Sequence, residues 1–196
     1  MRTEELPNFT IINNGKISKE LVNLGIKDFY QAINFIGNLP YGRNSQRSLY
    51  QLVLTEKRGT CSTKHALLSR LCIEQQVEEI KLYTGIYEMT EYNTPGVGAI
   101  LKKYGLEFLP EAHCYLKYNE KRYDFTRLDV KGEPINTFLV EEKITPAQIG
   151  NYKINFHRSY IPVWLRDKGL CHKFNTDNLW EIREDCIKKL SQEIQE

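Results

Sequence analysis

Apolar side chains recur at helical spacing before residue 40, at Phe29, Ile33 and Ile36. This spacing predicts a helix over residues 27–37 that ends at Gly37, with another helix before it. Residues 39–45 are predicted to form a loop, and a short helix is expected over residues 49–54.

The longest helical pattern runs from about Cys61 to Gln75. With successive residues about 100° apart, its apolar side chains fill one arc of roughly 140°, formed by Leu67, Leu68, Leu71 and Cys72. Cys61 falls inside the same arc, so we expect its sulfur on the face turned to the core. Gly59 permits a positive φ before the helix, and Thr60 can cap its first turn.

An alternating pattern over residues 79–88 predicts a β-strand. One face would carry Ile80, Leu82, Thr84 and Ile86, and the other Lys81, Tyr83, Gly85 and Tyr87. A β-hairpin is predicted over residues 111–126, with a two-residue turn that pairs Tyr118 with Lys121.

Three further helices are predicted from their start signals. Proline at the first helical position marks helices over residues 94–104 and 145–164. Asn178 and Glu181 have the spacing of a capping box, which predicts the start of the last helix.

Helices therefore gather at both ends of the chain and antiparallel strands in its middle, which is typical of the α+β class. With 196 residues, the chain is long enough for one well-cored domain and short for two. We expect a single domain over residues 1–196, with its core over about residues 39–126 and a C-terminal helical extension over about residues 145–196.

Composition narrows the class of function. Hydrophobic residues make up 41% and charged residues 27% of the chain, the balance of a globular protein. The net charge is only +2 and the basic residues are scattered, which argues against nucleic-acid binding. No apolar run reaches membrane-spanning length, and residues 1–7 lack the pattern of a signal peptide. The five cysteines include no Cys-x-x-Cys pair, which favours reduced thiols in the cytoplasm over disulfides or a zinc site.

The segment Gly59-Thr60-Cys61 places a thiol in the first turn of a predicted helix. Backbone amides and the positive end of the helix dipole stabilise a thiolate at this position, and the same amides can accept an oxyanion. The alternative is that Cys61 is a buried structural cysteine, the commoner fate of a cysteine in a helix.

The predicted hairpin adds a histidine and an aspartate. Its register pairs His113 with Thr126, which makes His113 and Asp124 diagonal neighbours on one face. Their Cβ atoms would lie roughly 6–8 Å apart. A carboxylate at this distance can orient the imidazole and stabilise its charged form. The alternative is a surface histidine beside a solvated aspartate.

Other side chains are weaker candidates for chemistry. His65 lies four residues after Cys61, and we expect it to pack within the helix or to support the site. Asp129 is a weaker orienting residue than Asp124 because it lies beyond the end of the predicted hairpin. Cys114 faces away from His113 on its predicted strand and is expected in the core, whereas packing or surface positions are expected for His157 and His172.

At these residues the chain resembles the transglutaminase-like superfamily, whose fold is related to that of papain-type cysteine proteases. The resemblance covers about residues 39–126, from a loop containing Tyr41 to His113 and Asp124 on successive strands. It implies a papain-like core with the nucleophile helix packed on an antiparallel sheet. It also implies a catalytic triad of Cys61 as nucleophile, His113 as general base and acid, and Asp124 as the orienting carboxylate.

The chain departs from the family pattern at His65, because members usually have a small residue four positions after the cysteine. The donor that completes an oxyanion hole is left open. The candidates for oxyanion or substrate binding are Tyr41, Asn44, Gln46 and Gln51.

The resemblance implies a cysteine hydrolase or acyl transferase that acts through an acyl-enzyme, without a cofactor or metal. Its substrate would be an amide bond in a peptide, a protein or a small molecule. Proteases, amidases, cross-linking enzymes and inactive relatives share this fold, so the alternative is a catalytically inactive binding module that keeps the pocket. Residues 93–98, in the insertion before the hairpin, form either a substrate-gating lid or a decorated crossover.

Overall fold

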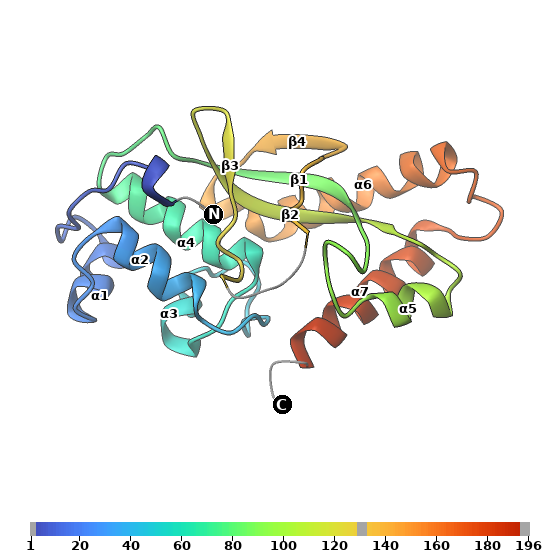
Figure 1. The fold of residues 1–196 in the computed structure, drawn as a ribbon, viewed down its shortest axis with the longest axis horizontal. Coiled ribbons are helices and arrows are strands. Elements are labelled where there is room, and N and C mark those ends of the chain that lie inside the picture. Colours follow the sequence, from blue (N-terminus) through green and yellow to red (C-terminus); the bar gives the residue numbers. More distant parts are fainter. Residues whose placement is uncertain (1–2, 129–132, 193–196) are drawn as a thin grey trace. The chain divides into compact units, whose positions relative to one another are not determined.

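The computed structural model describes residues 3–128 and 133–192. In these residues the fold is mixed α+β, as predicted, with seven α-helices and a four-stranded antiparallel sheet (Figure 1). The strands lie in the order β3-β2-β1-β4. The chain divides into two compact units. Unit 1 is drawn from Met1–Thr84, Cys114–Asp129 and Glu142–Gly150, and unit 2 from Gly85–His113, Val130–Glu141 and Asn151–Glu196.

Unit 1 contains the four α-helices of the N-terminal part of the chain and two short 3-10 helices. The α-helices are α1 (Lys16–Asn23), α2 (Phe29–Gly37), α3 (Leu52–Glu56) and α4 (Cys61–Glu74). The 3-10 helices are η1 (Thr3–Glu5) and, later in the sequence, η2 (Pro146–Ile149). The helices predicted over residues 27–37 and 61–75 are confirmed within two residues. Helix α3 begins three residues later than predicted, because residues 49–51 form turns ahead of it.

Helix α4 is the centre of unit 1 and packs against α1, α2, α3 and η2. Twelve of its fourteen residues are buried. The predicted division of this helix into one core arc and a solvent face is therefore too simple. Because polar residues on α4 are buried as well, each of them needs a hydrogen-bond partner inside the protein.

Close packing, rather than an unusual backbone conformation, explains the glycine before α4. Gly59 is not among the residues with positive φ, so the positive φ considered for it is not adopted. A Cβ at this position would lie 2.9 Å from Val53 Cγ2, and 3.0 Å from both Thr63 Oγ1 and Lys64 Cγ. Thr60 caps α4 as predicted, in a capping box with Thr63.

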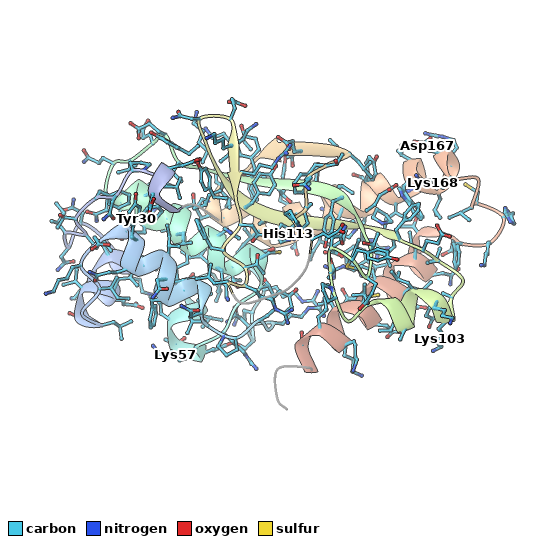
Figure 2. The ribbon with its side chains drawn as sticks, viewed as in Figure 1. Tyr30, Lys57, Lys103, His113, Asp167 and Lys168 are labelled. Carbon is cyan, nitrogen blue, oxygen red and sulfur yellow. The ribbon has the colours of Figure 1, made fainter. Side chains whose placement is uncertain are left out.

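The sheet is formed by β1 (Lys81–Met89), β2 (Leu109–Tyr118), β3 (Lys121–Tyr123) and β4 (Val140–Lys143). His113 lies midway along β2 (Figure 2). The predicted register of the hairpin is confirmed, since Tyr118 pairs with Lys121. Its turn residues Asn119 and Glu120 have φ of 47° and 59°, as a type I′ turn requires. Strand β4 was not predicted.

The hairpin is shorter than predicted at its open end. Strand β3 ends at Tyr123, so Asp124 and Thr126 do not continue the ladder. The Asp124 side chain instead accepts hydrogen bonds from the backbone N–H and the hydroxyl of Thr126. Such a local side-chain bond turns the backbone away from strand pairing.

Unit 2 contains α5 (Gly98–Lys103), α6 (Asn151–Asp167) and α7 (Thr176–Gln192). Helices α5 and α6 both pack against α7. The helix predicted over residues 145–164 is divided at Gly150 into η2 and α6. Two other starts are also displaced. The first turn of α7 is capped by Asn175, which accepts the N–H of Asn178 at 2.9 Å, and α5 starts at Gly98, where the Glu91 carboxylate accepts the backbone N–H.

Gly59→Ala should lower the free energy of unfolding by about 1–3 kcal/mol, because the new methyl group overlaps the surrounding side chains. Gly42→Ala is the control, since its Cβ would meet only the flexible Arg58 side chain, at 3.3 Å. Urea unfolding followed by circular dichroism measures both variants. An equal loss of stability in the two would contradict the steric explanation.

Candidate active site

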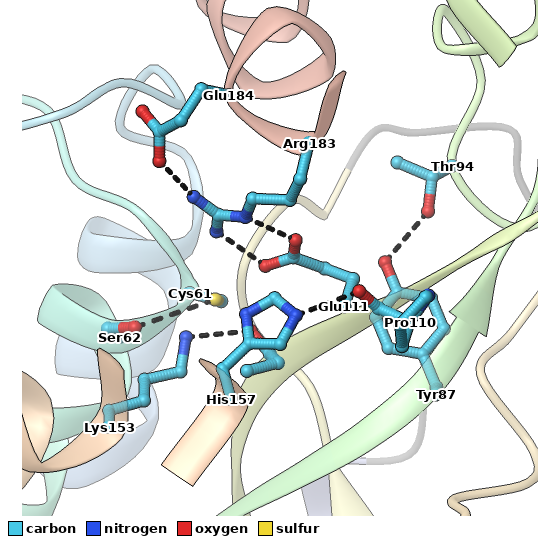
Figure 3. A network of polar contacts seen from close by, with 11 residues as sticks. Cys61, Ser62, Tyr87, Thr94, Pro110, Glu111, Lys153, His157, Arg183 and Glu184 are labelled. Atoms are coloured by element: carbon cyan, nitrogen blue, oxygen red, sulfur yellow. Dashed lines mark hydrogen bonds and ion pairs between the residues drawn. The ribbon is translucent and has the colours of Figure 1, made fainter. Parts of the chain in front are cut away.

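Cys61 is the first residue of α4, in unit 1. Its sulfur lies 3.8 Å from Ser62 Oγ (Figure 3), and the residue is 8% exposed. The amides of the first turn and the positive end of the helix dipole lie at this end of α4. The sulfur is thus held where a negative charge is favoured.

Four of the five cysteines, Cys61 included, are buried. Cys72, Cys114 and Cys186 are fully buried, whereas Cys171 is exposed, and none of the five, all within the described residues, forms a disulfide. Burial raises the pKa of Cys72 far above its usual value and that of Cys186 to about 12. These two thiols are therefore unreactive near neutral pH. Cys114 lies in the core, as predicted.

His65 connects Cys61 to the segment after β3. Its Nδ1 donates to the backbone carbonyl of Cys61 at 2.8 Å, and its Nε2 accepts the backbone N–H of Phe125 at 2.8 Å. These two bonds require the Nδ1–H tautomer, in which Nε2 carries no proton. Asp124 Oδ1 approaches Nε2 to 3.6 Å, which is too long for a hydrogen bond. The packing role predicted for His65 agrees with its complete burial.

Lys64 holds the same segment from the neighbouring position on α4. Its side chain is fully buried, and its ammonium donates to three backbone carbonyls, those of Gly37 (3.2 Å), Leu39 (2.5 Å) and Thr126 (2.7 Å). Three acceptors match the three N–H groups of an ammonium. Lys64 and His65 together fix residues 125–126 against α4.

Asp124 follows β3 and is one-third exposed. Its Oδ1 accepts from the Thr126 backbone N–H at 2.9 Å and from the Thr126 hydroxyl at 2.5 Å. The carboxylate is therefore fixed locally, beside His65. Asp129, the weaker orienting candidate, lies outside the described residues.

His113 is the last residue of β2 that belongs to unit 2. It is 9% exposed, and Tyr87 of β1 contacts its ring in a T-shaped arrangement, with centroids 5.9 Å apart and planes at 80°. Cys61 and Asp124 thus lie in unit 1 and His113 in unit 2.

Two of the oxyanion candidates lie in buried or half-buried positions before α4. Asn44 is buried, and its amide N–H groups donate to Glu56 Oε2 (3.1 Å) and to the carbonyl of Arg58 (3.0 Å). It therefore holds the loop rather than presenting a donor to a substrate. Gln51 Oε1 is buried without a hydrogen-bond partner among the described residues.

The remaining candidates lie nearer the surface. Gln46 is exposed, and Tyr41 is half-buried beneath the guanidinium of Arg127, 5.2 Å from the ring centroid. Tyr41 also bridges to Gly59 in parallel fashion, which fixes the loop against the turn before Cys61. Tyr41 and Asn44 are therefore both placed beside that turn, Asn44 through the carbonyl of Arg58.

Unit 2 contains a buried ion pair that sequence reasoning missed. Glu111 of β2 accepts two hydrogen bonds from Arg183 of α7, both 2.6 Å long (Figure 3). Arg183 also donates to Glu184 at 2.7 Å. Burial alone would raise the pKa of Glu111, but the charge and hydrogen bonds of Arg183 lower it to about 2. The carboxylate therefore stays ionised.

Helix α6 contributes two further hydrogen-bond donors, Lys153 and His157, which bind backbone carbonyls beside Glu111 on β2. Lys153 donates to the carbonyl of Ala112 at 2.7 Å, and His157 Nε2 donates to the carbonyl of Pro110 at 2.8 Å. Burial lowers the pKa of His157 to about 4, against the opposing attraction of Glu111. His157 is thus a neutral packing residue, within the range predicted for it, whereas His172 is exposed.

Lys64→Met should lower the free energy of unfolding by about 2–4 kcal/mol, because three carbonyls lose their buried donor. Lys19→Met, at an exposed position of α1, is the control and should stay within about 0.5 kcal/mol of wild type. Urea unfolding measures both. If the two variants behaved alike, the ammonium would not hold unit 1 together.

His157 should make stability depend on pH. Between its usual pKa of 6.5 and its folded pKa of about 4, the unfolded chain binds a proton that the native protein does not. Stability should therefore fall by up to about 2 kcal/mol as the pH drops from 6.5 to 4.5. Glu111 contributes no loss in this window, because a carboxyl with a lowered pKa loses its contribution only below its usual value of 4.5.

Urea unfolding across that pH range checks this expectation. His157→Gln should give a shallower pH dependence than wild type, whereas His172→Gln, at an exposed position, should follow wild type. Identical slopes in wild type and His157→Gln would contradict the effect of burial on this imidazole.

Comparison of the chain with models of protein families, with curated proteins and with solved structures gives no match. In residues 3–128 and 133–192, no helix is both long and apolar enough to cross a membrane. The same residues contain no group of three or more His, Cys, Asp and Glu placed to hold a metal ion.

Proposed function

We propose that this protein is a cysteine-dependent hydrolase or acyl transferase with a papain-like, transglutaminase-like core. The observation that carries the proposal is the position of Cys61 at the capped start of α4, where the thiol is buried with 8% of the residue exposed. The first-turn amides of a helix favour a thiolate at this position. A reducing cytoplasm would keep this thiol active. The substrate class is an amide bond in a peptide, a protein or a small molecule.

The proposed partners of Cys61 are His113 as general base and acid, and Asp124 as the orienting carboxylate. Within unit 2, the ring of His113 is held by Tyr87. Within unit 1, Asp124 is held by Thr126. Fixed side chains of these types suit a triad, because catalysis needs a defined orientation of the imidazole.

The reaction begins when the Cys61 thiolate attacks the amide carbonyl carbon and forms a C–S bond. The C–N bond then breaks, and the amine leaves with a proton donated by His113. Water or a second amine next attacks the thioester carbonyl and gives its proton to His113. The C–S bond breaks, which releases the acid or the new amide and restores the thiolate.

A non-catalytic binding module is the second candidate. It is favoured by Asn44, whose amide N–H groups both hold the loop and are thus not available to an oxyanion. In that case Cys61 would be a structural residue at a helix start. Chemical reactivity of Cys61 separates the two candidates.

His113→Gln should lower the rate of Cys61 alkylation at pH 7 at least about tenfold, because a thiolate loses its imidazolium partner. The measurement uses iodoacetamide, with peptide mass spectrometry, in a Cys171→Ser background that removes the exposed thiol. His172→Gln is the matched control and should leave the rate unchanged.

The pH dependence of the same reaction tests the orienting residue. In wild type the rate should remain high below the usual pKa of a thiol, and Asp124→Asn should weaken this low-pH reactivity. A folded His113→Gln variant with a wild-type profile would remove His113 from the site and favour the binding module.

A further inference from the structure

Tyr87 is a buried tyrosine of unit 2 whose ring and hydroxyl have different partners. Its ring meets His113 in the T-shaped contact described above, and Phe138 contacts it at 6.2 Å between centroids, with planes at 65°. Its hydroxyl lies 2.9 Å from Thr94 Oγ1 (Figure 3). Tyr87 is 4% exposed, and its hydrogen bond to Thr94 is part-buried.

The direction of the hydrogen bond between Tyr87 and Thr94 follows from the neighbours of Thr94. Thr94 Oγ1 donates its single proton to Asn93 Oδ1 at 3.0 Å. A hydroxyl has one proton to give, so the Tyr87 O–H must donate to Thr94. The tyrosine ring is therefore held at its hydroxyl end by an acceptor whose own orientation is fixed.

The segment that presents Thr94 is braced by its own side chains. Asn93 Oδ1 also accepts the backbone N–H of Thr90 at 3.0 Å, and Asn93 Nδ2 donates to the carbonyl of Glu88 at 2.9 Å. The Glu91 carboxylate accepts the N–H of Gly96 at 3.0 Å. Residues 90–96 thus form a loop whose conformation is held by hydrogen bonds within the loop and to the end of β1.

The tyrosine ring is also restricted by Phe138. A Cβ on Gly85 would lie 2.4 Å from Phe138 Cδ1, so the phenyl ring packs directly on the backbone of β1. Tyr87 can therefore move little without displacing either Phe138 or Thr94. An aromatic ring fixed in this way limits rotation of an imidazole that it meets edge to face.

We propose that Tyr87 is a positioning residue for His113, and that Thr94 sets the position of Tyr87 from the loop over residues 90–96. The inference rests on the proposed function, in which His113 serves Cys61. It gives the insertion before β2 a role in orienting the imidazole.

Tyr87→Leu removes the ring, whereas Tyr87→Phe keeps the ring and removes only the hydroxyl. Thr94→Val removes the same hydrogen bond from its other end, together with the bond from Thr94 Oγ1 to Asn93 Oδ1. Tyr92→Phe is the control, because Tyr92 lies in the same loop and its side chain is exposed. Two readouts apply to each variant: the NMR titration of the His113 ring protons, and the rate of Cys61 alkylation in the Cys171→Ser background.

Tyr87→Leu should change the His113 titration and slow alkylation of Cys61 at pH 7 by about 3- to 10-fold, the range for loss of one aromatic contact. Tyr87→Phe should slow it about twofold and Thr94→Val at least as much, because Thr94→Val also removes the bond to Asn93. The double variant should lose no more than Thr94→Val alone, since the bond between Tyr87 and Thr94 can be lost only once. Tyr92→Phe should match wild type.

Different measurements test the proposed function and the positioning role of Tyr87. A wild-type rate in folded His113→Gln overturns the proposed function, whatever Tyr87 does to the imidazole. A wild-type His113 titration in Tyr87→Leu, or strictly additive losses in Tyr87→Phe and Thr94→Val, overturns the positioning role. The Tyr87→Phe and Thr94→Val variants keep the buried ring, so this comparison holds even where Tyr87→Leu folds poorly.

Discussion

The buried ammonium of Lys64 is the interaction on which unit 1 depends. It joins α4 to the end of α2, to the loop at Leu39 and to the segment after β3, through carbonyls that would otherwise be buried without a donor. His65 adds a second tie to that segment through Phe125. Lys64 and His65 lie about one helical turn after Cys61. Helix α4 therefore carries both the candidate nucleophile and the buried polar side chains that hold the segment after β3.

Local signals in the sequence were sufficient for the elements that hold the candidate nucleophile. The cap at Thr60, the start of α4 and the register of the β2–β3 turn were all predicted correctly, because each depends on residues close in sequence. The burial of Lys64 was not predicted, since periodicity assigns a charged side chain to the surface. Its acceptors are backbone carbonyls, which every residue has, so the pattern of side chains along the sequence does not indicate where they lie.

Longer-range relations account for the other differences. Asp124 left the predicted ladder because its carboxylate binds Thr126, a local competition that alternation alone does not reveal. The partner of Glu111 lies 72 residues away on α7, so no local pattern points to it. The ring beside His113 belongs to a strand that was predicted, yet pairing it with His113 required the order of the strands in the sheet.

The discontinuity of unit 1 has a consequence for synthesis of the chain. Lys64 precedes its acceptor at Thr126 by 62 residues, and unit 1 takes its last residues from Glu142–Gly150. At translation rates of about 5–20 residues per second, α4 leaves the ribosome roughly 3–12 seconds before that acceptor exists. During this interval the residues that will bury α4 have not all been synthesised, so side chains that are buried in the folded protein stay exposed to solvent. Such exposed segments of a nascent chain are the kind of surface that chaperones bind.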